Sequence, residues 1–262
     1  MPNHITNRLE LVGDQSKINE LLEAVRYDNE PIGTLDFNKI IPMPKSLDIT
    51  SGSIEKDSIM AYLKAACPIT GDFGVKKLDA LAFRDILEKL NSKFYVKYSE
   101  SRIMETDLNA PNTSKLLELG KTYIDNLVNY GATTWYDWCC DKWGTKWNSY
   151  SPEPFENNTL TFSTAWSRAL PIIEKMSEMY PDIRFKYAWA DEDIGVNVGK
   201  LEIMNKEIDF LDIPDAHSKE AYEMAADIRG CSLEDYSLYY DEKSETYEYR
   251  EESEEIETPK MS

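Results

Sequence analysis

Residues 4–13 end in the alternating stretch Leu9-Glu10-Leu11-Val12, and the pattern then changes to a helical period, which predicts a strand followed by a helix. Asp14 is a suitable N-cap for that helix. The apolar positions of the helix recur at i, i+3, i+4 and i+7, and they are Ile18, Leu21, Leu22 and Val25. Pro31 and Gly33 end this unit, and a second strand is predicted over residues 34–41.

The same order of elements returns later in the chain. Residues 159–166 alternate as a strand, and Ser167 is a candidate N-cap for a helix that tolerates Pro171 in its first turn. Two further strands are predicted over residues 184–190 and 196–207. Two strand–helix units with return strands predict an α+β fold of the ferredoxin-like type, in which an antiparallel sheet has helices on one face.

The residues between these two units have a helical pattern. Helices are predicted over residues 58–66 and 78–90, and a third helix is expected to end at Gly131. We therefore predict one ferredoxin-like domain over residues 1–210, interrupted by a helical insertion at about residues 46–131.

Residues 211–262 are predicted to form an acidic, tyrosine-rich C-terminal extension. A short helix is expected over residues 218–229, and a hairpin is expected to turn at residues 241–244. Residues 234–262 contain 11 acidic and 3 basic side chains, and the last dozen residues are predicted to be disordered.

The formal net charge is −19, from 48 acidic and 29 basic side chains. Such a charge repels nucleic acid and anionic membranes and favours cationic partners. No direct binding to nucleic acid or to a membrane is therefore expected. A high acidic content serves solubility in many proteins, and it also allows a surface to imitate a nucleic acid and occupy a basic groove. The N-terminal segment lacks the pattern of a secretory signal, so a cytoplasmic location is expected.

Candidate residues for catalysis are scarce. The chain has two histidines, His4 and His217, and none of the common phosphate-loop, dinucleotide or zinc-protease motifs. Its four cysteines form no C-x-x-C pair. The acidic run Asp191–Asp193 has the oxygen ligands that a hard cation needs, but such a run between two strands is more often a solvated turn. We predict no catalytic residue, no metal site and no cofactor.

All six tryptophans lie between Trp135 and Trp189, and four of them are in WYDWCCDKWGTKWN at residues 135–148. One interpretation is that the indoles join the helical insertion to the sheet. The other is that some indole edges stay exposed for binding, with Trp143 and Trp147 as the best candidates.

Four motifs together resemble one family of proteins. The motifs are MPNHITNRLEL at the N-terminus, FNKIIPMP at residues 37–44, the tryptophan block, and LTFSTAWS at residues 160–167. They look like the YubB-like ferredoxin-like domain proteins of plasmids, phages and related bacterial genomes. The resemblance covers roughly residues 1–45 and 130–200, and it implies a ferredoxin-like fold with a variable helical stretch. Members of the family read S-P-P where this chain has Ser167-Arg168-Ala169. The resemblance implies no established activity.

The preferred hypothesis is a non-enzymatic acidic interaction protein of a mobile genetic element. Its expected partner is a basic host protein, such as a defence protein or a nucleic-acid-binding enzyme, which it would inhibit by charge mimicry. An alternative is a hydrolase of a sugar or nucleotide that uses carboxylates near a tryptophan-lined cleft. A third is a module that acts by self-association. The predicted partner-binding residues are Asp191, Glu192, Asp193, Glu234, Asp235, Asp241, Glu242, Trp143 and Trp147.

Overall fold

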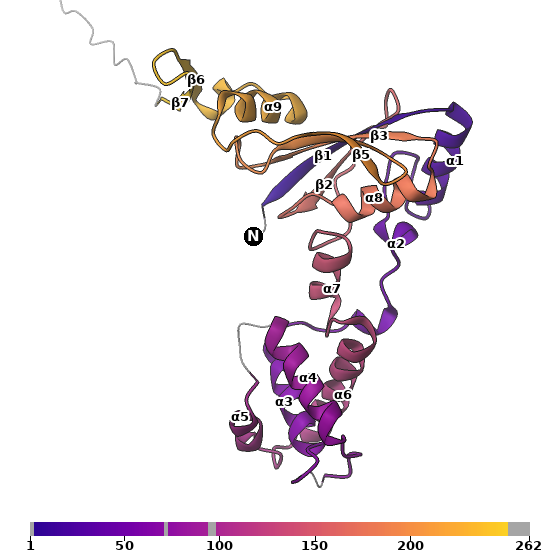
Figure 1. Ribbon diagram of the computed structural model, residues 1–262, viewed down its shortest axis with the longest axis vertical. Helices are drawn as coiled ribbons and strands as arrows, with labels where there is room; N and C mark the ends of the chain where they lie inside the picture. Colours follow the sequence, from indigo (N-terminus) through magenta and orange to yellow (C-terminus); the bar gives the residue numbers. More distant parts are fainter. Residues whose placement is uncertain (1–2, 71–72, 94–97, 251–262) are drawn as a thin grey trace, which may run out of the picture. The chain divides into compact units, whose positions relative to one another are not determined.

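The computed structural model describes residues 3–70, 73–93 and 98–250. The chain divides into two compact units (Figure 1). One is built from Met1–Ile41 and Trp143–Ser262 and contains the main sheet, and the other is the helical segment Pro42–Lys142.

The main sheet has five strands. They are β1 (His4–Val12), β2 (Thr159–Ala165), β3 (Arg184–Asp191), β4 (Gly199–Met204) and β5 (Glu207–Asp212). Their order in the sheet is β2-β1-β3-β4-β5, and all neighbours are antiparallel. The α+β, ferredoxin-like fold predicted from the alternating segments is confirmed.

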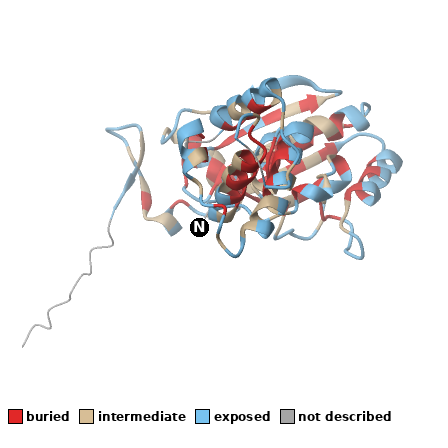
Figure 2. Cartoon of the chain, turned by 90° about the horizontal axis from the view of Figure 1, so that it is seen from below, coloured by how far each residue is buried: buried red, intermediate tan, exposed pale blue. Residues whose placement is uncertain are grey.

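One face of the sheet carries the core. Leu9 on β1 lies opposite Leu160 on β2 and Tyr187 on β3, and these three side chains are buried. Buried residues (red in Figure 2) alternate with intermediate ones along β1 and β2, as the period of two requires. Helices α1 (Gln15–Val25) and α8 (Leu170–Met179) supply the apolar stripes that complete this core. Asp14 caps α1 as predicted, accepting hydrogen bonds from two backbone N–H groups of the first turn.

The prediction of a strand over residues 34–41 is wrong. Its place is taken by a short helix, α2 (Phe37–Ile40), and only an isolated bridge precedes it. Asp36 caps α2 by accepting the N–H of Asn38 at 3.0 Å, while the N–H of Phe37 donates to the Asn148 side chain at 2.8 Å. The helical turn buries Phe37 and Ile40 on one side.

The prediction that Ser167 is the N-cap of the following helix is also wrong. The N-cap of α8 is Ala169, which makes no side-chain hydrogen bond, and Pro171 lies in the first turn as expected. The hydroxyl of Ser167 donates instead to the carbonyl oxygen of Gly144 at 2.5 Å.

The helical unit contains the 3-10 turn η1 (Lys45–Leu47) and the helices α3 (Ser53–Ala65), α4 (Ala80–Lys93), α5 (Glu100–Glu105), α6 (Thr113–Tyr130) and α7 (Trp135–Lys142). The helices predicted over residues 58–66 and 78–90 and the stop at Gly131 are confirmed. A separate core joins α3, α4 and α6 through Leu63, Leu90 and Leu127, among others. Among the residues that the structure describes, no helix is both long and apolar enough to cross a bilayer.

The C-terminal region begins with α9 (Lys219–Arg229) and continues with η2 (Glu234–Tyr236) and the hairpin of β6 (Leu238–Asp241) and β7 (Thr246–Tyr249). The predicted helix and hairpin are confirmed. Ala221 and Ala225 of α9 pack with Ala190 of β3, whose side chain belongs to the face opposite the main core. Part of that second face is therefore covered by α9, while the predicted disorder of the last dozen residues concerns positions outside the described part of the chain.

Candidate functional site

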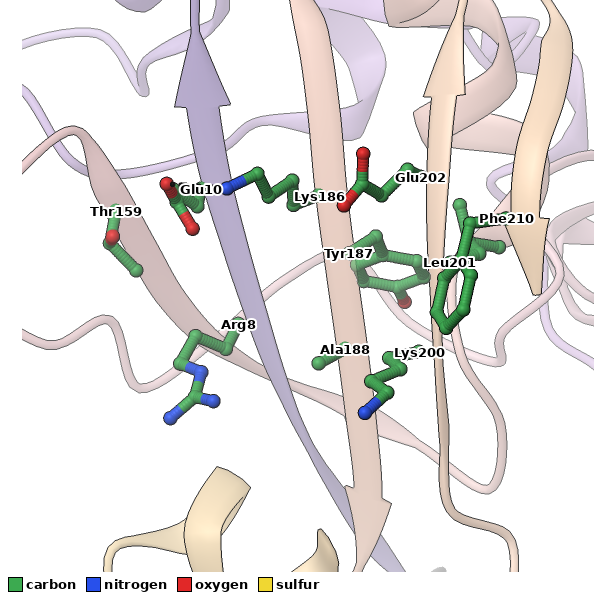
Figure 3. Close-up of a pocket in the computed structure, with 10 residues that line it drawn as sticks. All are labelled: Arg8, Glu10, Thr159, Lys186, Tyr187, Ala188, Lys200, Leu201, Glu202 and Phe210. Atoms are coloured by element: carbon green, nitrogen blue, oxygen red, sulfur yellow. Dashed lines mark hydrogen bonds and ion pairs between the residues drawn. The ribbon is translucent and has the colours of Figure 1, made fainter. Parts of the chain in front are cut away.

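A groove with a volume of about 380 Å³ lies on the second face of the sheet, beside the part that α9 covers. Glu10 and Lys186 point toward one another across β1 and β3 in Figure 3, with 3.2 Å between their charged atoms. Glu202 pairs with Arg184 at 3.3 Å, and Lys200 pairs with Asp212 at 3.4 Å. The carboxylates of this groove are thus neutralised by neighbouring cations, which is the arrangement of a structural cross-strand ladder.

Two other cavities lie elsewhere in the molecule. One, in the sheet unit, is lined by Pro31, Pro152 and Phe155, and one, in the helical unit, is lined by Cys67, Phe83 and Glu100. No tryptophan lines any of these three cavities. In the part of the chain that the structure describes, no group of three or more His, Cys, Asp or Glu side chains is placed to hold a metal ion. These cavities therefore do not favour the alternative of a hydrolase with a tryptophan-lined cleft.

The predicted acidic turn follows β3, and its three carboxylates have different environments. Asp191 is 5% exposed and accepts hydrogen bonds from the side chains of Asn3 and Asn197 and from the N–H of Asp193, each at 3.0 Å. Asp191 therefore holds the turn together from inside. Glu192 and Asp193 are exposed, and neither makes an ion pair with a residue that the structure describes. These two are the carboxylates of the turn that a partner can reach.

His217 joins this turn to the C-terminal hairpin. The backbone N–H of His217 donates to the carbonyl oxygen of Gly195 at 2.8 Å. The backbone carbonyl oxygen of His217 accepts the hydroxyl of Thr246 at 2.9 Å. The His217 ring also lies within hydrogen-bonding distance, 3.0 Å, of the Tyr222 hydroxyl. Two acidic segments that the sequence separates by about forty residues are consequently neighbours on one surface.

The acidic residues of the C-terminal region also divide into carboxylates that are fixed by hydrogen bonds and carboxylates that a partner can reach. Asp241 accepts the N–H groups of Lys243 and Ser244 at 3.1 Å, and these hydrogen bonds lower the pKa of its carboxyl group. Glu234 and Asp235 accept hydrogen bonds from Ser232, which fixes them at the start of η2. Other acidic side chains are exposed and make no ion pair with a described residue: Glu242, Glu245 and Glu248.

The tryptophans of the predicted site also separate into a structural and an exposed group. Trp143 is 3% exposed, donates from its ring nitrogen to the carbonyl oxygen of Ile41 at 2.9 Å, and lies edge-on to Phe37. It is a core residue of the sheet unit. Trp147 is 37% exposed. Sequence reasoning missed Trp166, which directly follows β2 and is 43% exposed.

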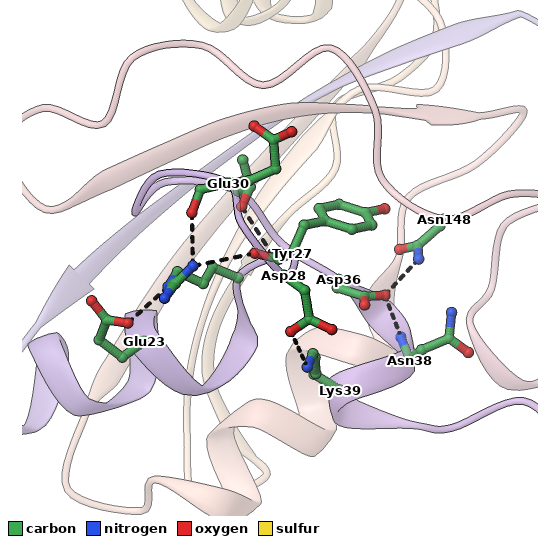
Figure 4. A network of polar contacts seen from close by, with 10 residues as sticks. Glu23, Tyr27, Asp28, Glu30, Asp36, Asn38, Lys39 and Asn148 are labelled. Carbon is green, nitrogen blue, oxygen red and sulfur yellow. Dashed lines mark hydrogen bonds and ion pairs between the residues drawn. The ribbon is translucent and has the colours of Figure 1, made fainter.

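The segment that carries Trp147 is fixed from the side by a polar network (Figure 4). The Asn148 amide group donates to Asp36 at 2.7 Å. The ring hydroxyl of Tyr27 donates to the Ser149 carbonyl oxygen at 2.9 Å. Burial is the main cause that raises the pKa of Tyr27, to about 12, so this phenol stays protonated and keeps its hydrogen bond at neutral pH. The network holds the backbone that directly follows Trp147 within the sheet unit.

Trp166 has a backbone conformation that large side chains rarely adopt. Its φ is +71°, in the left-handed region. Two hydrogen bonds hold this conformation. The backbone N–H of Trp166 donates to the carbonyl oxygen of Asn3 at 2.9 Å, and the side-chain amide of Asn197 donates to the carbonyl oxygen of Trp166 at 3.3 Å. Strain of this kind is concentrated at functional sites in proteins. Its left-handed backbone therefore makes Trp166 a candidate functional residue of this surface.

We expect glycine at position 166 to give a more stable protein than alanine, by about 1 kcal/mol, because only glycine adopts a positive φ without a penalty. The measurement is urea unfolding of Trp166→Gly and Trp166→Ala followed by circular dichroism. Thr161 in the regular part of β2 is the control, and there Thr161→Gly is expected to be the less stable of the corresponding pair. Equal or greater stability of Trp166→Ala would contradict the left-handed conformation.

Comparison with known proteins finds a family that one part of the chain resembles. The model of a family described as the ferredoxin-like domain in Api92-like protein matches residues 142–232, which run from the end of α7 through the sheet to α9. This part of the chain is similar to that Api92-like domain. No curated protein matches the chain. Neither the family description nor the solved structure given below names YubB-like proteins, so that narrower resemblance stays a prediction.

A solved structure is also similar to the chain. It is the crystal structure of a protein api92 from Yersinia pseudotuberculosis, with 11% sequence identity and a TM-score of 0.39. The similarity covers 82% of this chain and 99% of that chain. The description of the family model that matches residues 142–232 agrees with the ferredoxin-like fold of the sheet unit, and neither comparison names an activity.

Proposed function

We propose that this protein is a non-enzymatic acidic interaction protein that binds a basic surface of another protein by imitating the charge of a nucleic acid. The expected partner is a host defence protein or another DNA-binding protein, and the mobile-element setting rests on the resemblance of the four sequence motifs. One observation carries the proposal. The acidic turn and the C-terminal hairpin lie together around His217, and their exposed carboxylates make no ion pair among the described residues.

The contrast with the rest of the sheet unit supports this proposal. Charges on the open sheet face are arranged in cation–carboxylate pairs, such as Glu10 with Lys186 and Lys200 with Asp212. Because the two charges of each pair cancel, such pairs leave little net electrostatic field at this surface. The carboxylates around His217 keep their charge available to a partner, and an uncompensated charge speeds and directs association with a surface of opposite sign. We call the acidic turn and the β6–β7 hairpin the acidic surface.

The experiment is affinity capture from a bacterial lysate with the full chain immobilised, at low and high salt, with partners identified by mass spectrometry. We expect a basic nucleic-acid-binding protein that is retained at low salt and lost at high salt, because exposed charges are screened. The captured protein should also lose its binding to DNA when this chain is added. A partner that still binds DNA, or the absence of any enriched basic protein, would contradict the proposal.

Two charge variants separate the acidic surface from the overall charge. Each removes four exposed carboxylates that make no ion pair with a described residue, by Glu→Gln or Asp→Asn. The first variant changes Glu192, Glu242, Glu245 and Glu248. The control variant changes Asp57, Glu88, Glu105 and Glu118 in the helical unit. We expect the first variant to weaken capture of the partner at least about tenfold and the control to have a much smaller effect. Equal weakening would assign the binding to net charge alone.

A further inference from the structure

Two exposed indoles share one cation at the edge of the acidic surface. The ammonium nitrogen of Lys146 lies 4.6 Å from the ring centre of Trp147 and 4.6 Å from the ring centre of Trp166. This is the distance at which a cation is attracted to the negative face of an aromatic ring. The two indoles come from different segments, one after α7 and one after β2. The fold thus places together two aromatic rings that are suited to hold a positive charge.

The hydrogen bonds around Trp166 connect this cation-binding pair to the acidic turn. The Asn197 amide donates both to the Trp166 carbonyl oxygen, at 3.3 Å, and to the buried carboxylate of Asp191, at 3.0 Å. The left-handed backbone of Trp166 is therefore held by the same residue that organises the turn.

Tyr150 makes the second connection. Its ring lies edge-on to Trp147, with 6.2 Å between the ring centres. Burial and then the negative charge of Glu192 raise the pKa of the Tyr150 phenol. The backbone N–H of Glu192 donates to the carbonyl oxygen of His4, whose side chain in turn contacts the Tyr150 hydroxyl at 2.7 Å. The backbone N–H of Trp166 donates to the carbonyl oxygen of Asn3, the residue before His4, so Trp166 and the exposed residue Glu192 are bound to consecutive residues where β1 begins.

Aromatic faces beside a carboxylate are the groups that recognise an arginine side chain. A guanidinium is planar and weakly hydrated, stacks on indole rings, and forms paired hydrogen bonds with a carboxylate. The lysine ammonium is compact and strongly hydrated, so Lys146 loses little when it moves from the rings into water.

We propose that Trp147 and Trp166 form an anchor site for an arginine of the basic partner. The guanidinium takes the place of the Lys146 ammonium against the indoles and pairs with Glu192. This inference rests on the proposed function, because it names the contact through which the acidic surface selects its partner. Tryptophan and arginine are also the residues that most often dominate the energy of protein interfaces.

The test uses the full chain and two peptide probes of equal length and charge, oligoarginine and oligolysine, with binding measured by titration calorimetry. We expect oligoarginine to bind about tenfold more tightly than oligolysine. The double variant Trp147→Ala with Trp166→Gly should abolish this preference while oligolysine binding changes little. Tyr249→Ala, which removes a 67% exposed ring from the hairpin, is the matched control and should keep the preference.

Removing the competing lysine gives a second readout that a structural role would not affect. Lys146→Met should increase the preference for oligoarginine by about threefold, since the ammonium no longer occupies the indoles. Lys243→Met removes the same charge from the exposed turn of the hairpin and should leave the preference unchanged. Circular dichroism spectra of all variants verify that they are folded.

The outcomes separate the anchor from the proposed function. Equal binding of both peptides, unaffected by the tryptophan substitutions, would overturn the arginine anchor while the acidic surface remains a binding surface. No binding of either peptide would overturn the anchor and the proposed function together. A preference that persists in the double tryptophan variant would place arginine recognition elsewhere and also overturn the anchor.

Discussion

Gly120→Ala is expected to destabilise the helical unit by about 2–3 kcal/mol, although alanine is normally the better helix former by up to about 1 kcal/mol. Gly120 is buried in α6 where this helix crosses α3. A methyl group at this position would overlap the backbone carbonyl oxygen of Ser58 and lie 2.6 Å from the Cβ atom of Tyr62. The backbone of one helix cannot move away without opening the core between them. The sign of the effect is therefore set by the contact between the helices and not by helix propensity.

Hydrogen exchange followed by mass spectrometry measures this effect where it occurs. The expected loss of stability corresponds to exchange about 30- to 150-fold faster in α3 and α6, with β1 to β5 unaffected. Val128→Ala is the control, because Val128 is in the same helix and is 51% exposed. Its exchange should change less than about threefold. A Gly120→Ala protein with wild-type or slower exchange in α6 would show that α3 and α6 do not approach this closely.

The elements that sequence analysis predicted well are those whose determinants are local. Helix α1 has its cap at Asp14 and its apolar stripe within the next eleven residues, so a short window contains the whole signal. The C-terminal hairpin was predicted for a similar reason, since Asp241 accepts the N–H groups of the turn that follows it.

The errors in the prediction arose where distant residues decide the local structure. Helix α2 is fixed in part by Asn148, which is 111 positions from the Phe37 N–H that it accepts. Asp191 was expected in an exposed turn, but its carboxylate is buried by contacts that include Asn3, 188 positions away. Trp166 directly follows a regular strand, and the sequence marks neither its left-handed backbone nor its exposure. No pattern of neighbouring residues contains this information.

The same distinction explains how much of the candidate site was visible in the sequence. The acidic composition of the turn and the hairpin was evident, and it led to the prediction of a basic partner. Their proximity was not, because it depends on the backbone bonds of His217 to Gly195 and Thr246. The two tryptophans were weighed as a pair at positions 143 and 147, whereas the structure buries Trp143 and pairs Trp147 with Trp166 through Lys146.

Asn7→Ala is expected to lower the free energy of unfolding of the sheet unit by about 3–5 kcal/mol, the largest effect among the predictions made here. Asn7 lies in the central strand β1 and is fully buried. Its amide group donates to the Phe162 carbonyl oxygen at 3.2 Å and to the Thr164 hydroxyl at 2.9 Å, and its side-chain oxygen accepts the Tyr187 hydroxyl at 2.5 Å. Alanine would leave these buried groups without partners and would create a cavity between β1 and its neighbours.

A double-mutant cycle separates the hydrogen bond between Asn7 and Tyr187 from the loss of packing. Asn7→Leu and Tyr187→Phe each leave a buried polar partner unsatisfied, and each should cost about 1–3 kcal/mol in urea unfolding experiments. The double variant removes both partners of this bond, so it should be less destabilised than the sum of the single variants by about 1–2 kcal/mol. The coupling is partial because the Tyr187 hydroxyl also accepts the Ala169 N–H at 3.1 Å, a bond that phenylalanine loses in either background. Strict additivity would mean that the Asn7–Tyr187 bond does not stabilise the core, and that Asn7 acts through the bonds of its amide group to Ile5, Phe162 and Thr164.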